Sequence, residues 1–102
     1  MDAVAPQPET MQQAGPVIVT IRNKRGLHAR ASAKFVTLAS SFDAVVTVAK
    51  DGAYVTGTSI MGLMMLAAAP GDTVELSATG PQAEIALAAL AGLIEARFDE
   101  RD

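Results

Sequence analysis

The sequence contains no cysteine and only one histidine, His28, among its 102 residues. The lack of cysteine excludes disulfide bonds, thiolate chemistry and zinc sites with sulfur ligands. A single histidine could join a metal site only beside several carboxylates, and the acidic residues form no such cluster along the chain. We therefore expect neither a metal nor another cofactor. No stretch of about 18 residues is both apolar and uncharged, so we expect no membrane-spanning helix and no membrane partner.

Residues 1–15 differ in composition from the rest of the chain. They are rich in proline, glutamine and alanine, and they lack the basic start and the apolar stretch of a secretory signal. We predict that they form a flexible tail on a cytoplasmic protein. Residues 16–102 suit one domain, because a chain of this length usually has a single hydrophobic core.

The spacing of apolar residues predicts four strands and three helices. Alternating apolar and polar residues predict strands at 16–23 and 73–78, and short runs of β-forming residues predict strands at 44–50 and 53–56. Apolar residues at helical spacing predict helices at 29–39 and 81–98, and a capping serine followed by methionine and leucine predicts a short helix at 59–66. Asp51-Gly52 predicts a tight hairpin between the second and third strands. The order β-α-β-β-α-β-α favours an α+β fold, an open-faced β-sandwich whose four-stranded antiparallel sheet is covered on one face by three helices.

The charges are unevenly distributed along the chain. The net charge of −3 argues against nucleic-acid binding. Residues 11–42, however, contain no carboxylate and hold five of the eight basic residues, namely Arg22, Lys24, Arg25, Arg30 and Lys34. His28 lies in the middle of this stretch. A basic patch on an acidic protein suits an anionic ligand or an acidic protein partner.

His28 stands at the start of the predicted helix 29–39. The first N–H groups of a helix have no partner within it and carry partial positive charge, so they bind anions. The backbone N–H groups of Ala29, Arg30 and Ala31, together with the Arg30 guanidinium, could therefore hold a phosphoryl group attached to the imidazole. From the spacing alone, His28 is interpreted equally well as a polar loop residue.

No second acid–base group accompanies His28 in the sequence. Tyr54 is isolated, and the carboxylates lie far from His28 along the chain. We therefore predict a phosphoryl carrier rather than an enzyme with its own turnover.

Two segments carry a family resemblance. Gly26-Leu27-His28-Ala29-Arg30 and Ser59-Ile60-Met61-Gly62-Leu63-Met64 resemble the histidine-containing phosphocarrier protein HPr of bacterial phosphotransferase systems, and the likeness extends over residues 17–98. It implies the same open-faced β-sandwich. It also implies that Nδ1 of His28 accepts a phosphoryl group from enzyme I, charged by phosphoenolpyruvate, and passes it to an enzyme IIA protein, with Arg30 as the active-site arginine.

The chain departs from the family pattern at Ala31, where most members have proline. Alanine restores a backbone donor and loosens the first helical turn. Together with the tail, this departure resembles the nitrogen-related, regulatory branch of the family more than a sugar-uptake carrier.

Ser59 has two compatible interpretations. Its hydroxyl suits the N-cap of helix 59–66, a role that contributes about 1 kcal/mol. By resemblance to HPr proteins controlled by HPr kinase/phosphorylase, Ser59 is also a regulatory phosphorylation site, where the added charge would repel an acidic partner approaching His28.

Residues around the two segments are expected to divide between the core and a docking surface for partners. Methionine adapts to several partners, so we expect part of the methionine-rich segment to be exposed. The predicted docking residues are Leu27, Lys34, Ile60, Met61 and Met64, with Met65 as an alternative to Met64. We expect a monomer, since a carrier must present its site to successive proteins.

Two other functions are left open. A purely regulatory binding module would use the same surface and Ser59 phosphorylation, and His28 would be incidental. A histidine-dependent phosphatase would need turnover by the protein alone and an acid beside His28.

Overall fold

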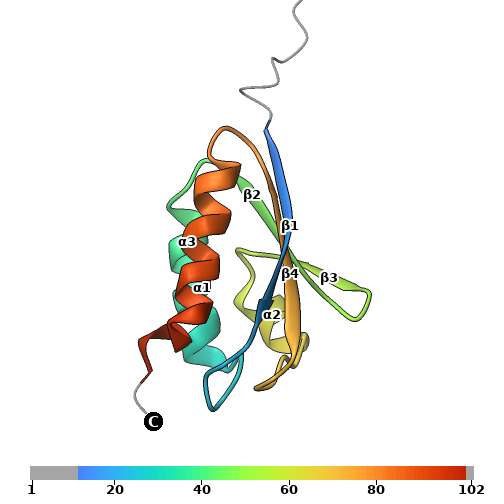
Figure 1. The fold of residues 1–102 in the computed structure, drawn as a ribbon, viewed down its shortest axis with the longest axis vertical. Coiled ribbons are helices and arrows are strands. Elements are labelled where there is room, and N and C mark those ends of the chain that lie inside the picture. Colours follow the sequence, from blue (N-terminus) through green and yellow to red (C-terminus); the bar gives the residue numbers. More distant parts are fainter. Residues whose placement is uncertain (1–11, 101–102) are drawn as a thin grey trace, which may run out of the picture.

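The computed structural model describes residues 12–100, which form a four-stranded antiparallel sheet and three helices (Figure 1). The strand order in the sheet is β1-β4-β2-β3. The elements along the chain are β1 (Gln13–Thr20), α1 (Ala29–Ser40), β2 (Val45–Lys50), β3 (Ala53–Thr56), α2 (Ile60–Met65), β4 (Thr73–Thr79), α3 (Ala83–Glu95) and a short turn, η1 (Arg97–Asp99). This order and the antiparallel pairing confirm the predicted fold.

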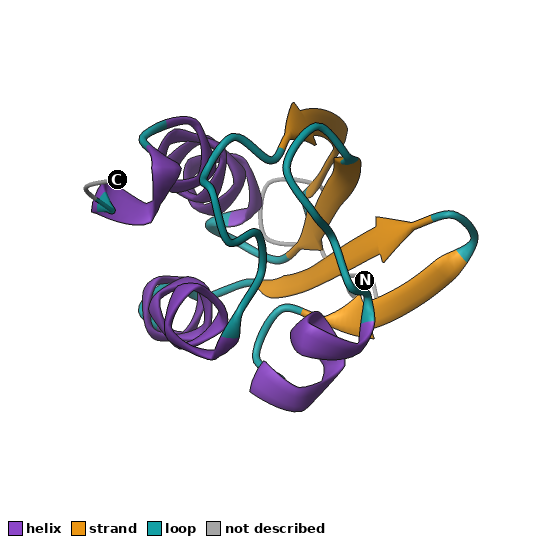
Figure 2. Cartoon of the chain, turned by 90° about the horizontal axis from the view of Figure 1, so that it is seen from below, coloured by secondary structure: helices purple, strands orange, loops and turns teal. Residues whose placement is uncertain are grey.

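The helices gather on one side of the sheet, as Figure 2 shows from below. Sheet residues that face them are buried, among them Val74 and Leu76 of the central strand β4. Ile18 and Tyr54 are exposed, at 67% and 73%. α1 and α3 run side by side along the sheet (Figure 1). Within residues 12–100, no helix is both long enough and apolar enough to cross a membrane.

Strand β1 begins earlier and ends earlier than predicted. Gln13 and Ala14 already pair with Thr79 and Ala78 of β4, and an irregularity between Ala14 and Val17 accommodates Gly15-Pro16 before regular pairing resumes. Residues 13–15 therefore belong to the sheet, not to the predicted tail. Residues 1–11 of that tail lie outside the described part of the chain.

The C-terminal helix is shorter than the predicted 81–98. α3 ends at Glu95, and Arg97, Phe98 and Asp99 then adopt positive φ angles of 59°, 54° and 59°. Left-handed geometry costs a residue with a side chain roughly 1–2 kcal/mol. The Phe98 ring is fully buried in the core, which returns about 1.5–3 kcal/mol. The chain thus leaves the helix axis while Phe98 keeps the core position that the apolar pattern predicted.

Replacing Phe98 with alanine is expected to lower the free energy of unfolding by about 3–5 kcal/mol, because the substitution empties a fully enclosed site. Urea denaturation at neutral pH measures the change. Ile85→Ala, which truncates a side chain that is 58% exposed on α3, is the matched control and should change stability little. Equal effects of the two substitutions would contradict the anchoring role of Phe98.

Candidate functional site

The loop between β1 and α1 places His28 at the start of α1. Leu27 N–H donates to the carbonyl oxygen of Ala68 at 3.0 Å, which ties the loop to the segment after α2. Gly26 permits this close approach, since its φ is +62° and a Cβ there would lie 2.3 Å from the same carbonyl oxygen. The helix then begins at Ala29, as predicted.

His28 is the N-cap of α1, and its ring takes part in the cap. Nδ1 accepts a hydrogen bond from the backbone N–H of Arg30 at 3.2 Å, and the His28 carbonyl accepts from Ser32 N–H at 2.9 Å. Nδ1 therefore faces the N-terminus of the helix, where partial positive charge favours an anion. The predicted position of His28 is confirmed, and the interpretation as an ordinary loop residue is replaced by that of a helix cap.

A carboxylate lies on the other side of the same ring. Nε2 of His28 and Oε2 of Glu100 are 2.5 Å apart, and both side chains are 16% exposed. The prediction that no second acid–base group accompanies His28 is therefore wrong, because a residue distant in the sequence lies beside the ring. Glu100 supplies the neighbouring acid that the sequence analysis did not find.

Asn23 holds this carboxylate from the interior. Its fully buried side chain donates from Nδ2 to both oxygens of Glu100, at 3.2 and 3.3 Å, and to the carbonyl oxygen of Gly26 at 2.8 Å. One amide group therefore links the loop before His28 to the C-terminal segment. Neither Asn23 nor Glu100 was a predicted site residue, and an isolated asparagine and a terminal acidic run give no local signal of such a pair.

Opposing effects act on the ionisation of Glu100. Burial alone would raise the pKa of its carboxyl group. The hydrogen bonds from His28 and Asn23, together with the charge of Arg25, outweigh burial and hold the pKa below its usual value. The carboxylate form is therefore favoured.

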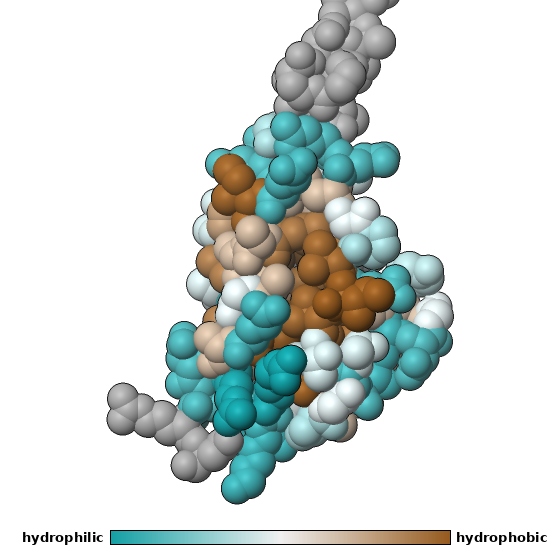
Figure 3. Space-filling view, viewed as in Figure 1, coloured by the Kyte–Doolittle hydropathy of each residue, from teal (hydrophilic) through white to brown (hydrophobic). Residues whose placement is uncertain are grey.

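Basic residues surround this pair in an open cavity of about 340 Å³. Figure 3 shows hydrophilic residues gathered at the lower end of the molecule, near the C-terminal end of the chain. The lining residues are Lys24, Arg25, His28, Arg30, Lys34, Asp99 and Glu100. The predicted basic patch is confirmed for four of its five members, and a cavity with this lining suits a small anion.

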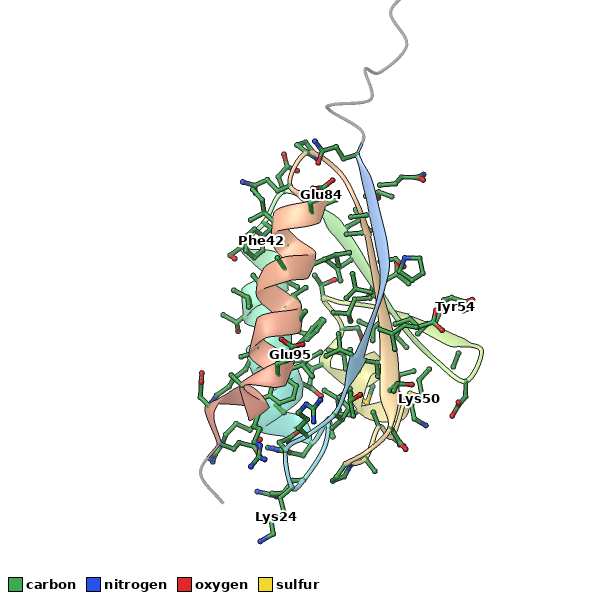
Figure 4. All side chains as sticks on the ribbon, viewed as in Figure 1. Lys24, Phe42, Lys50, Tyr54, Glu84 and Glu95 are labelled. Carbon is green, nitrogen blue, oxygen red and sulfur yellow. The ribbon has the colours of Figure 1, made fainter. Side chains whose placement is uncertain are left out.

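The other predicted site residues differ in their surroundings. Lys34 donates from Nζ to the Phe98 carbonyl oxygen at 2.7 Å and lines the cavity, so it lies at the predicted rim. Leu27 is only 6% exposed and belongs to the core, so its predicted docking role is wrong. Leu27 belongs to the hydrophobic core cluster, and its loop lies close to Ala68 because Gly26 permits the backbone approach. Tyr54 lies on β3, away from the loop that carries Lys24 (Figure 4).

Helix α2 divides between core and surface, as predicted. Ser59 is its N-cap, and the Ser59 Oγ accepts from Gly62 N–H at 2.9 Å. Leu63 is fully buried. The exposed apolar residues of the helix are Ile60, Met61, Met64 and Met65. α2 packs beside α1, so these side chains form an apolar surface on the helix next to the one that His28 caps.

The sequence and the fold both match known proteins. The family model for the PTS HPr component phosphorylation site matches residues 17–96. The phosphocarrier protein NPr of Shewanella violacea is 45% identical over 82 residues, which cover 80% of this chain and 90% of that protein. The phosphocarrier protein HPr of Cupriavidus necator is 52% identical over 81 residues, covering 79% and 91%. The crystal structure of HPr-C-His from Thermoanaerobacter tengcongensis has a TM-score of 0.81 at 44% identity, covering 90% of this chain and all of that one.

The open-faced β-sandwich with a histidine at the N-cap of its first helix places the chain among the HPr-type phosphocarrier domains that it matches in structure. The chain belongs to the HPr family, and it is a phosphocarrier of the bacterial phosphotransferase system. Relatives named NPr and HPr have similar identities to it, so its place in the nitrogen-related branch stays a prediction.

The oligomeric state also stays a prediction. A solved HPr dimer from Thermoanaerobacter tengcongensis shares 46% identity with this chain at a TM-score of 0.68, covering 85% of this chain and all of that one. A member of the family has therefore been solved as a dimer, and the monomer remains an expectation.

Glu100→Gln is expected to destabilise the fold at neutral pH and to have little effect in acid. The folded pKa of Glu100 lies below its ordinary value of 4.5, so its carboxylate stabilises the folded state fully above that value. This contribution is lost as the pH falls through the folded pKa. Urea denaturation of both proteins over a series of falling pH values measures the difference. Glu95→Gln removes an exposed carboxylate from α3 and serves as the control. A difference in stability that stays the same size as the pH falls would contradict the assignment.

Proposed function

We propose that this chain carries a phosphoryl group on Nδ1 of His28, accepting it from enzyme I and passing it to an enzyme IIA protein. The observation that supports the proposal most directly is the position of Nδ1, which lies 3.2 Å from the backbone nitrogen of Arg30 in the first turn of α1. A phosphoryl group on Nδ1 would meet the positive end of the helix.

The transfer step exchanges one bond for another. The Nδ1 lone pair forms a bond to phosphorus, the bond from phosphorus to the donor breaks, and its electron pair stays with the donor. Nδ1 then accepts no hydrogen bond, so the Arg30 N–H becomes available to a phosphoryl oxygen. The N–H groups of Ala29 and Ala31 and the Arg30 guanidinium are further donors in the same turn. The reverse exchange delivers the group to the next protein, so the chain itself consumes no substrate.

The surface beside His28 supports docking of successive partners. Lys34 at the cavity rim is basic, and α2 presents the exposed apolar residues Ile60, Met61, Met64 and Met65. Flexible methionine side chains adapt to more than one partner. Basic and apolar groups together favour an acidic partner surface with an apolar centre. We place this relay in the cytoplasm.

Incubation with enzyme I and phosphoenolpyruvate is expected to add one phosphoryl group that is labile in acid and stable in alkali, mapped to His28 by mass spectrometry under non-acidic conditions. His28→Ala should accept none, because the nucleophile is gone. Arg30→Ala should accept the group at least roughly 10-fold more slowly, since it loses a charge-assisted contact. Arg22→Ala removes a basic residue that does not line the cavity and is the control. Phosphorylation of His28→Ala, or unchanged cellular function of that variant, would favour the purely regulatory binding module.

Ser59 is proposed as a second, regulatory phosphorylation site for a kinase of the HPr kinase/phosphorylase type. Its Oγ caps α2, so a phosphate there would lie at a helix N-terminus and add about −1.5 to −2 charge. Because α2 packs beside α1, this charge would oppose an acidic partner that approaches His28.

Ser59→Asp is expected to keep the cap and to slow phosphoryl transfer from enzyme I. Aspartate caps helices as well as serine does, so the free energy of unfolding should change little, whereas the added charge repels an acidic partner. Ser59→Asn, a neutral residue that also caps well, is the matched control and should transfer at the wild-type rate. Stopped-flow quench measurements at low and high salt give the rates, and an equal rate for both variants would contradict the regulatory role.

A further inference from the structure

We infer that Glu100 is a positioning residue for phosphoryl transfer, because it holds the His28 ring with the proton on Nε2 and leaves the lone pair on Nδ1. This inference rests on the proposed transfer through Nδ1. It goes further because it proposes that Glu100, far from His28 in the sequence, determines the tautomer and the orientation of the His28 ring.

The hydrogen-bond roles around the ring follow from the partners. A backbone N–H can only donate, so Nδ1, 3.2 Å from the Arg30 nitrogen, must be the acceptor. A neutral imidazole has one acceptor and one N–H, so the proton is on Nε2. An ionised carboxylate only accepts, and Oε2 of Glu100 is 2.5 Å from Nε2. The two contacts therefore select the same tautomer from opposite sides of the ring.

Asn23 fixes the carboxylate in the same way. Its Nδ2 faces three acceptor oxygens, two on Glu100 and one on Gly26, and Asn23 is fully buried. The reversed amide would place Oδ1 against those oxygens. The orientation with Nδ2 toward these oxygens leaves Oδ1 buried with no hydrogen-bond partner among the described residues.

The backbone that brings Glu100 to the ring adopts an unfavourable left-handed conformation just before it. Three consecutive residues, Arg97, Phe98 and Asp99, have positive φ, although none is glycine. The buried Phe98 ring and the hydrogen bond from Lys34 to the Phe98 carbonyl oxygen hold this turn in place. Left-handed residues of this kind persist only where the surrounding structure determines them, and they concentrate at functional sites. If α3 continued as a regular helix, these three residues would not need positive φ angles.

This arrangement has a chemical consequence for transfer. When the Nδ1 lone pair bonds to phosphorus, positive charge develops on the ring, and the carboxylate at Nε2 stabilises it. The Nε2 proton stays on the ring throughout, between Nε2 and Glu100. The hydrogen bond that the Arg30 backbone N–H donates changes its acceptor from Nδ1 to a phosphoryl oxygen. Glu100 thus orients the nucleophile without contacting the transferred group.

Phosphoramidate is the phosphoryl donor for the test, because this small molecule involves no docking surface. The Nδ1–phosphorus bond forms, the phosphorus–nitrogen bond of the donor breaks, and ammonia leaves. Glu100→Gln is expected to lower the first-order rate of His28 phosphorylation roughly 10-fold or more, the effect of losing one charge-assisted hydrogen bond. Glu95→Gln is the matched control, since Glu95 is exposed on α3 outside the cavity and the substitution changes the net charge equally.

Nitrogen-15 NMR of the His28 ring provides a readout independent of transfer. At alkaline pH, the wild-type protein and Glu95→Gln should both show a protonated Nε2 whose proton exchanges slowly with water. Glu100→Gln and Glu100→Ala should lose that slow exchange, while their amide spectra show that the fold persists. An unchanged Nε2 proton in both Glu100 variants, or an unchanged rate in Glu100→Gln, would overturn the inference. Failure of the wild-type protein to accept phosphate on His28 would instead overturn the proposed function, and the NMR result would still decide the role of Glu100.

Discussion

The hydrogen bond between the His28 imidazole and the Glu100 carboxylate joins the first helix to the last described residue of the chain. Much of the site depends on it. Nε2 of the ring donates to the Glu100 carboxylate, and Nδ1 accepts from the Arg30 backbone N–H. The Asn23 side chain donates to the same carboxylate. Each partner can act in only one direction, so the network has one consistent arrangement of protons.

The fold supplies the supports of this network from distant elements. The sheet and the buried face of α1 fix the helix whose N-terminus His28 caps. Gly26 lets the preceding loop contact the backbone after α2, while Phe98 anchors the turn that returns the chain to the site. A phosphocarrier has to keep its nucleophile accessible as well as oriented. Ala29 and Arg30 in the first turn of α1 are exposed, so the helix N-terminus beside the ring is accessible to a partner.

Features governed by neighbouring residues were predictable from the sequence. His28 and Ser59 precede good helix formers and both cap helices, and Asp51-Gly52 makes the hairpin between β2 and β3. Leu27 was assigned to the surface because the sequence does not reveal how far its loop descends. The C-terminal helix was extended too far for a related reason. The apolar spacing correctly marked Phe98 as buried, but an apolar pattern records burial and not the path of the backbone.

The sequence by itself determined the order of the elements, the two helix caps and the basic stretch around His28, because each depends on residues only a few positions apart. Tertiary structure alone decided that an acidic residue completes the site. His28 and Glu100 are 72 positions apart, and their contact exists only after α3 packs on the sheet and the left-handed turn reverses the chain. His28 therefore lies in a stretch of sequence without carboxylates but pairs with a carboxylate in the folded protein. Charges interact according to their separation in space, whatever their separation in the sequence.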